Sequence, residues 1–326
     1  MKKIVVIGGA GYVGSKLVAE LLKKSFYVTV YDLFIYGNHL PKNIKNLKIE
    51  VGDVRDLKKL KKIIKNQDVV IHLACISNDP SFELNPKLSF EVNYLCFEPL
   101  VKICKELRVS HFIYTSSSSV YGVKNEKEVT EKCSLDPLTD YSRFKAECEN
   151  ILLKYSDYDF VGTILRPATV CGYSPRQRLD LVVNILTNSA YHKKEIKVFG
   201  GKQLRPNIHI DDIVRSYLCI LASDKKKVSN EIFNVGFENY SIAELAAMVK
   251  NNISHEIKII LEQTDDNRSY HISSKKISNL LNFYPEKNIN IAIKDLALAF
   301  EKKILINTFS DPIFFNLKKM QLIELR

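Results

Sequence analysis

Short apolar runs alternate with amphipathic stretches along the first half of the chain. The runs are rich in β-branched residues and lie at 3–8, 27–32, 47–53, 69–74, 111–116 and 160–167. Near-continuous apolar runs of this length are typical of strands buried on both faces. The stretches between them repeat apolar positions at helical spacing. This alternation predicts an α/β fold with a doubly wound parallel sheet.

The rhythm breaks after Pro167. Loop-rich segments surround one helical pattern at 179–192, a strand is expected at 231–236, and the tail from Ser241 is expected to hold two more helices. We therefore predict two parts, each built from separate stretches of chain. The main sheet domain takes 1–167 and 208–236, and a smaller α/β lobe takes 168–207 and 237–326.

The charge balance adds a preference for anionic small molecules. The chain has 326 residues and a formal net charge of +11, but its lysines are spread along the whole length. A solvated helix face explains the densest cluster, 58–65, better than a nucleic-acid patch does, so no nucleic-acid partner is expected. A positive field still favours an anionic substrate. No apolar stretch approaches the length that spans a membrane, so no membrane role is expected.

The seven cysteines are scattered, odd in number and without a C-x-x-C pair. This pattern predicts reduced thiols in a cytoplasm and argues against a disulfide framework and a zinc site. His209 and His271 lack paired ligand spacing, so structural roles are expected for them and no metal is predicted.

A glycine motif stands between the first strand and the first helix, formed by Gly8, Gly11, Tyr12, Val13 and Gly14. Glycines at such a turn allow the backbone to approach a diphosphate, and the following helix offers free N–H groups to it. Asp32 ends the second strand, where a carboxylate would bond ribose hydroxyls and repel a 2′-phosphate. The sequence therefore predicts a dinucleotide site that prefers NAD to NADP.

Several motifs together resemble the extended short-chain dehydrogenase/reductase family, which comprises nucleotide-sugar epimerases, dehydratases and reductases. They are GGAGYVG, Asp53-Val54, HLA, TSSSSVYG, the Tyr141 to Lys145 segment, RPATVCGYSPR, GGKQLRPNIHIDDI and FNVG, spread from residue 1 to about 300. The resemblance implies a Rossmann fold with bound NAD. It places Asp53 and Val54 at the adenine, and it lines the cofactor groove with Leu73, Ala74, Asn93 and Pro167.

Tyr141 and Lys145 form the expected catalytic pair. They stand four residues apart on one face of a helical stretch. A phenol with its usual pKa of about 10 is a poor base at neutral pH. The ammonium of Lys145 and a positively charged nicotinamide would both lower that pKa. Tyr141 could then take a proton from a sugar hydroxyl while hydride leaves the same carbon. Both residues would also contact the nicotinamide end of NAD.

The serine row decides between reaction classes. By the family resemblance, Ser117 binds the reacting sugar oxygen as a third catalytic residue, with Ser118 beside it in the substrate site. The family's 4,6-dehydratases carry Thr-Asp-Glu where this chain has Ser117-Ser118-Ser119. Serine hydroxyls are too weakly acidic and basic to replace those carboxyl groups, so dehydration is disfavoured. The family's reductases that epimerise at C3 and C5 have a cysteine in this segment, and this chain has none.

A nucleotide-diphosphate sugar is the expected substrate. Charge-assisted bonds from arginines would clamp its diphosphate. The candidates for its binding site outside the serine row are Ser77, Asn78, Thr169, Arg178, Arg205 and Arg268. Thr169 stands where the family's epimerases have an asparagine.

Oxidation of the sugar's C4 hydroxyl is the reaction that remains. An enzyme that stops at this step is a 4-dehydrogenase. One that returns the hydride to the opposite face is a 4-epimerase. Segments such as YGNHLP and GYSPRQRLDLVVN resemble bacterial surface-polysaccharide enzymes, among them GDP-heptose 4-dehydrogenases. A non-catalytic dinucleotide sensor is the least favoured reading, because such proteins tend to lose the tyrosine or the lysine. The helices expected at 86–107 and 141–155 would form a homodimer interface in this family.

Overall fold

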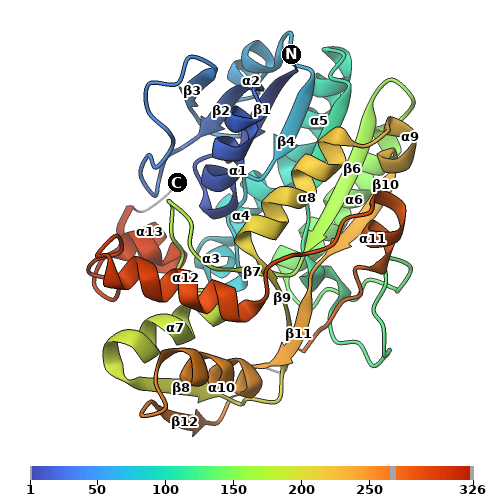
Figure 1. Cartoon of the computed structure of the whole chain (residues 1–326). Coiled ribbons are helices and arrows are strands. Elements are labelled where there is room, and N and C mark those ends of the chain that lie inside the picture. The colour runs from blue at the N-terminus through green and yellow to red at the C-terminus, as the bar shows by residue number, and fades with distance from the viewer. Residues whose placement is uncertain (1, 265–268, 324–326) are drawn as a thin grey trace.

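The chain is built around one seven-stranded parallel sheet, which confirms the predicted fold class. A computed structural model describes residues 2–264 and 269–323. In spatial order the sheet contains β10 (Glu231–Val235), β6 (Val161–Pro167), β5 (His111–Thr115), β4 (Val69–His72), β1 (Lys3–Ile7), β2 (Tyr27–Asp32) and β3 (Leu47–Val51). All of its pairings are parallel (Figure 1). The strand order reverses between β1 and β4, which is where such sheets bind ligands at their carboxyl ends.

Alternating side chains of the central strands fill two cores. Ile4 and Val6 of β1 point to one face of the sheet, and Val5 and Ile7 point to the other. Strand β3 differs from the expectation of a buried strand. It is an edge strand, and Lys48, Ile49 and Val51 are exposed because its outer side meets solvent.

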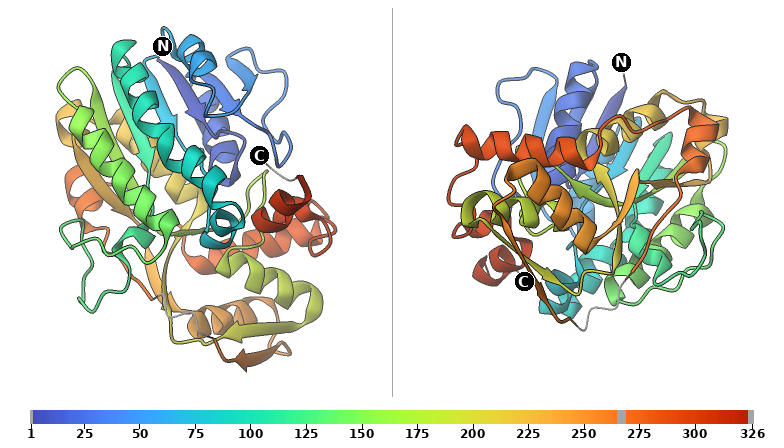
Figure 2. Two further views of the ribbon diagram at one scale, coloured as in Figure 1. Left: turned by 180° about the vertical axis from the view of Figure 1, so that it is seen from behind. Right: turned by 60° about the horizontal axis from the view of Figure 1, so that its bottom comes forward.

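Helices cover both faces of the sheet. Helices α1 (Tyr12–Lys23) and α8 (Ile210–Ala222) lie together on one face (Figure 1). Helices α2 (Leu57–Ile64), α5 (Phe97–Glu106) and α6 (Asp140–Tyr155) cover the other face, which Figure 2 shows from behind. The first turn of α6 is fixed by a capping box between Thr139 and Ser142.

The helix expected at 86–107 is divided. Helix α4 (Pro86–Phe90) continues into a π-helical turn, η1 (Glu91–Leu95), before α5 begins. The preceding α3 (Asp79–Leu84) is capped by the side chain of Asn78. Asn93 lies inside the π-helical turn, and such turns mark places where a helix adapts to a local constraint.

The smaller lobe lies below the carboxyl ends of the sheet in Figure 1. Strands β7 (Thr169–Cys171), β9 (Leu204–His209) and β11 (Glu238–Ser241) form one small sheet, and β8 (Glu195–Phe199) pairs with β12 (Lys258–Glu262). Helices α7 (Val182–Lys193), α10 (Ile242–Ile253) and α12 (Ile289–Glu301) pack on one another there. The chain passes between the two parts from β6 to β7, from β9 to α8 and from β10 to β11. It returns once more at α11 (Lys275–Leu281), which packs on β10 of the main sheet, although 237–326 was expected to belong to the smaller lobe.

Short elements complete the structure. They are η2 (Ser118–Tyr121), α9 (Lys225–Val228), α11 (Lys275–Leu281), η3 (Pro312–Phe314) and α13 (Asn316–Ile323). The described residues after Ser241 thus form four α-helices where two were expected, because α11 and α13 are too short to give a clear periodic pattern. Among the described residues, no helix is long and apolar enough to cross a membrane.

Candidate active site

A cavity of about 380 Å³ opens at the carboxyl ends of the strands, where the sheet order reverses. Its walls come from the glycine motif, the segments after β2, β3, β4 and β5, the start of α6, and the loop after β7. Asn316 at the start of α13 also contributes. The cavity therefore brings together segments that lie far apart in the sequence, as dinucleotide-binding sheets do.

The glycine motif forms a backbone cradle for an anion. Gly8 has φ +84°, and a Cβ placed on it would lie 2.4 Å from the backbone nitrogen of Ala74. A Cβ on Gly14 would lie 2.5 Å from the carbonyl oxygen of Gly8. Gly11 is the N-cap of α1, and no side chain caps the first turn. The free N–H groups of that turn fit a diphosphate at the cavity wall.

Gly8→Ala is expected to lower the free energy of unfolding by about 3 kcal/mol or more, because it adds a clash to a left-handed backbone. It should also reduce the NAD content of the purified protein. Chemical denaturation and quantification of released NAD measure the two effects. For stability, Gly11→Ala is the matched control, since its Cβ would meet only the Gly8 oxygen at 3.3 Å and its φ is −75°. Equal losses of stability in both variants would contradict the strain assigned to Gly8.

Asp32 lies beside this cradle with an oriented carboxylate. Its Oδ2 accepts the backbone N–H of Ala10 at 2.9 Å, and its Oδ1 accepts that of Phe34 at 2.8 Å. Burial raises the pKa of Asp32, and the two backbone bonds oppose that shift. Each oxygen keeps a lone pair for ribose hydroxyls, which fits the predicted role.

Asp53 and Val54, which were expected at the adenine, lie next to Arg55 in the turn after β3. All three line the cavity. The Arg55 guanidinium donates to both oxygens of Asp53, and to Glu91 at 2.8 Å. Burial opposes ionisation of Asp53, but its bonds from Arg55 outweigh burial and lower the pKa of the carboxyl. The ion pair rigidifies the turn after β3 that carries Val54.

Leu73, Ala74 and Pro167 line the cavity as expected, whereas Asn93 does not. The Asn93 side chain is buried, and its amide makes two bonds to the backbone of Ile76, one to the N–H at 2.8 Å and one to the carbonyl at 3.0 Å. The expectation that Asn93 lines the groove is therefore wrong, and its role is indirect. It fixes the segment after β4, and Ile76 of that segment does line the cavity.

Tyr141 and Lys145 both line the cavity from the first turns of α6. The buried Lys145 donates from Nζ to the Thr115 carbonyl at 2.7 Å, and its Nζ lies 6.0 Å from the centre of the Tyr141 ring. Burial raises the pKa of Tyr141 well above its usual range, Cys75 and Asp79 raise it further, and Arg178 lowers it. The positive charges of Lys145 and of a bound nicotinamide would both oppose this shift.

Ser117, Ser118 and Ser119 line the same cavity as Tyr141. The Oγ atoms of Ser117 and Ser119 are 2.8 Å apart, and the backbone N–H of Ser119 donates to Ser117 at 3.1 Å. This local turn starts η2, and the serine row that lines the cavity carries no carboxyl group of its own.

A buried ion pair holds the serine segment from behind. Glu149, on the same face of α6 as Lys145, accepts the hydroxyl of Ser116 at 2.5 Å and pairs with Arg166 of β6 at 2.6 Å. Arg166 also donates to the hydroxyl of Tyr121 at 2.7 Å. The network ties both ends of the TSSSSVYG segment to α6 and β6.

The proposed sugar-binding residues Ser77, Asn78 and Thr169 line the cavity. The side chain of Asn78 is occupied as the N-cap of α3, where it accepts the N–H of Ser81 at 3.0 Å. The Ser77 hydroxyl accepts from Arg178 at 3.3 Å and from Asn316 at 2.8 Å. Asn78 and Ser77 are thus held by the protein, and Thr169 lies at the start of β7.

The arginines expected to form one clamp lie in different places. Arg178 lines the cavity next to Ser77 and pairs with Asp180 at 2.8 Å. Arg205 is not part of the cavity wall. Its guanidinium lies 5.2 Å from the ring centre of Tyr270, and Tyr270 does line the cavity. Arg268 lies outside the described residues. The expectation that Arg178 and Arg205 converge on one wall is therefore wrong. Arg178 belongs to the Tyr141 end of the cavity, and Arg205 lies next to Tyr270.

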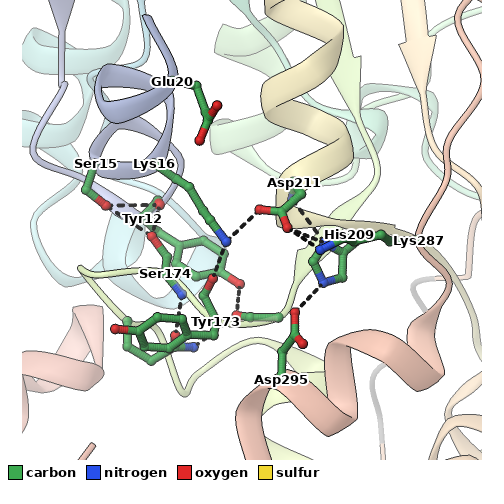
Figure 3. Close-up of polar contacts among 12 residues, drawn as sticks. Tyr12, Ser15, Lys16, Glu20, Tyr173, Ser174, His209, Asp211, Lys287 and Asp295 are labelled. Atoms are coloured by element: carbon green, nitrogen blue, oxygen red, sulfur yellow. Dashed lines mark hydrogen bonds and ion pairs between the residues drawn. The ribbon is translucent and has the colours of Figure 1, made fainter. Parts of the chain in front are cut away.

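Figure 3 shows a second polar cluster, formed by His209, Asp211 and Asp295 with two lysines. Asp211 accepts from Lys16 at 2.5 Å and from Lys287 at 2.6 Å. The two ammonium groups compete with any cation at its carboxylate. The cluster connects α1 to the start of α8 and to the segment before α12, so we assign it a structural role.

Tyr36, Cys75, Arg176, Tyr270 and Asn316 are cavity residues that the sequence analysis did not identify. Arg176 stands two positions before Arg178 in the same loop, which was the signal available for it. Asn316 lies beyond the stretch that carries the family motifs, so nothing in its neighbourhood pointed to the site.

A family model described as the NAD dependent epimerase/dehydratase family matches residues 4–236. That match takes in the glycine motif, the serine segment, Tyr141 and Lys145. The chain belongs to this family. The family's dependence on NAD and the fit of the cradle and Asp32 agree, so the chain is an enzyme whose cofactor is NAD.

Relatives within the family differ in the reactions their names describe. The chain is 32% identical over 264 residues to the uncharacterized UDP-glucose epimerase YtcB of Bacillus subtilis, a match covering 76% of this chain and 81% of that one. It is 28% identical over 302 residues to the dTDP-D-glucose 4,6-dehydratase of Bos taurus, covering 86% and 83%. The UDP-glucuronic acid 4-epimerase of Bacillus cereus, solved with UDP-glucuronic acid and NAD, matches with a TM-score of 0.81 at 26% identity, covering 92% and 99%.

Proposed function

We propose that the enzyme oxidises the C4 hydroxyl of a nucleotide-diphosphate sugar and releases the 4-keto sugar. The observation that carries this proposal is the composition of one cavity wall. Tyr141, Lys145 and Ser117 line the cavity together, and the residues beside Ser117 are serines. A base for a hydroxyl proton is thus at hand, while the serine row offers no acid or base for a further elimination.

In the proposed reaction, Tyr141 and Ser117 contact the reacting sugar oxygen. NAD supplies the hydride acceptor for the hydrogen on C4. The Tyr141 oxygen takes the hydroxyl proton as the carbonyl forms, so one hydride and one proton leave the sugar. Lys145 holds positive charge within 6.0 Å of the Tyr141 ring centre and favours the phenolate. Ser117 keeps the oxygen in line by a hydrogen bond.

Dehydration needs two more proton-transfer groups than this mechanism does. One acid would protonate the leaving hydroxyl, and one base would remove a proton from C5. Among the described residues that line the wall near Tyr141, one carries a carboxylate: Asp79, which accepts the hydroxyl of Thr139 at 2.7 Å. A single carboxylate does not provide both groups, which favours simple oxidation over the dehydratase reaction of some relatives.

A 4-epimerase is the second candidate, and the names of several relatives support it. It uses the same first step, after which the 4-keto sugar rotates and hydride returns to its opposite face. The same three residues serve both outcomes. The difference lies in whether the sugar turns within the cavity or leaves it.

A sugar deuterated at C4 separates the candidates. We expect one equivalent of deuterated NADH for each equivalent of 4-keto sugar, measured by absorbance and mass spectrometry. Inverted sugar that keeps its deuterium, without net NADH, would establish the epimerase instead. A 4-keto-6-deoxy product would contradict both candidates and reinstate dehydration.

We further propose a GDP-heptose as the substrate and bacterial surface polysaccharide, such as a capsule, as the destination. The support is the resemblance of YGNHLP and GYSPRQRLDLVVN to enzymes of that class. Seven unpaired cysteines support a cytoplasmic enzyme. Leu84 and Leu95, exposed by 41% and 56% beside α4 and α5, support a homodimer through that face. Thermal stabilisation by a panel of nucleotide sugars, and light scattering, test these assignments.

A further inference from the structure

Arg176 occupies a distinctive place in the cavity wall. Its charge interacts with Asp32, at the adenosine ribose end, and with Arg178. Arg178 in turn interacts with Tyr141, at the nicotinamide end. Arg176 therefore shares the cavity wall with residues of both ends of the groove, Asp32 and Tyr141. In NAD the diphosphate is the part that joins the two ribosides.

The guanidinium of Arg176 is buried without an acidic partner. The residue is 2% exposed, and no carboxylate in the described part of the chain forms an ion pair with it. The nearby Asp180 pairs with Arg178 instead. The Nε of Arg176 and one terminal nitrogen of Arg178 are buried without a hydrogen-bond partner among these residues. Burial and the charge of Arg178 lower the pKa of Arg176 to about 10. Such a charge is costly unless an anion joins it.

The surroundings of Arg176 hold it rigidly next to the glycine cradle. Its guanidinium stacks at 3.9 Å on the ring of Tyr36 and donates to Asn316 at 2.6 Å. The loop that carries it is bonded to α1, since Ser174 donates to the Tyr12 carbonyl at 2.7 Å and lies 3.0 Å from the Ser15 hydroxyl. The free N–H groups of α1 and the guanidinium thus belong to one rigid unit.

We propose that Arg176 binds the diphosphate of NAD, opposite the N-terminus of α1. A guanidinium matches phosphate oxygens with a fixed pair of donors and keeps its charge when buried. The diphosphate would be held from two sides, by backbone N–H groups and by Arg176. The proposal concerns the cofactor alone and holds whether the enzyme is a dehydrogenase or an epimerase.

The test compares ligand binding to Arg176→Gln and to Arg108→Gln, a matched loss of one exposed arginine just after α5. The probes are NAD, ADP-ribose and adenosine, with GDP and UDP for the sugar-nucleotide end. For Arg176→Gln we expect the dissociation constants of NAD and ADP-ribose to rise about 10- to 100-fold. Adenosine, which lacks phosphate, should bind as before. Arg108→Gln should leave all of these constants unchanged.

Protein stability separates binding from a structural role. Because Arg176→Gln removes a buried unpaired charge, the melting temperature of the cofactor-free protein should stay equal or rise. Unchanged NAD affinity, or an equal loss for adenosine, would overturn the proposal. So would a loss confined to GDP or UDP, which would assign Arg176 to the substrate. If Arg176→Gln does not fold, Arg176→Lys serves: it keeps the charge without the fork, and unaltered NAD affinity there would also overturn the proposal.

Discussion

Tyr141→Phe should lower kcat by about 10²- to 10⁴-fold, which is the contribution typical of a positioned general base. The substitution removes the oxygen that receives the proton and leaves the buried ring in place. NAD should remain bound, because the cradle and Asp32 do not depend on the phenol oxygen. The measurement is the rate of NADH formation in a single turnover with a nucleotide sugar.

The matched control for this change is Tyr158→Phe, because the Tyr158 side chain is 86% exposed. Its kcat should equal that of the unaltered enzyme. If Tyr141→Phe kept full activity, the base would have to be another group, and Asp79 would be the first to examine. Loss of NAD together with activity would instead indicate that the phenol oxygen serves the cofactor.

Glu149→Ala is expected to lower the free energy of unfolding by about 3–5 kcal/mol, because it leaves the charge of Arg166 buried and uncompensated. The two side chains are 2% and 3% exposed, so solvent cannot replace the lost partner. The hydroxyl of Ser116 also loses its acceptor, and the start of the serine segment is released. Urea denaturation followed by circular dichroism measures the change.

Two further variants show whether the charge is the cause. Glu20→Ala breaks a solvent-exposed pair with Lys23 and should cost about 0–1 kcal/mol. Glu149→Leu combined with Arg166→Met removes both buried charges and should regain most of the stability lost in Glu149→Ala. A double variant as unstable as the single one would show that packing, and not the unpaired charge, governs this position.

Much of the main sheet could be predicted because its strands are apolar on both faces. The runs that form β1, β4 and β6 can be identified as strands from their own sequence, because such apolar composition is not found at exposed positions. Strand β3 was expected to be buried, but it lies at the edge of the sheet and only one of its sides is covered. The short strands of the smaller lobe, such as β8 and β12, have too few buried positions to give a recognisable apolar pattern in the sequence.

The local parts of the site were equally readable. Three motifs depend only on local geometry and can be found in the sequence. They are the glycine turn, the acid at the end of β2, and the tyrosine four residues before a lysine on one helix. Arg176 and Asn316 cannot be found in this way: the bond that joins them spans 140 positions of sequence. Which loop closes over the cradle depends on how the smaller lobe packs, and no short-range pattern encodes that packing.

The repeated passage of the chain between its two parts limits how new specificities can arise. The smaller lobe contains β7, β9 and β11; β7 follows β6, β9 leads into α8, and β11 follows β10. No single cut separates one part from the other, so the smaller lobe cannot be exchanged between relatives as a module. Diversification has to proceed through individual substitutions in the loops that follow the strands, on a scaffold inherited whole.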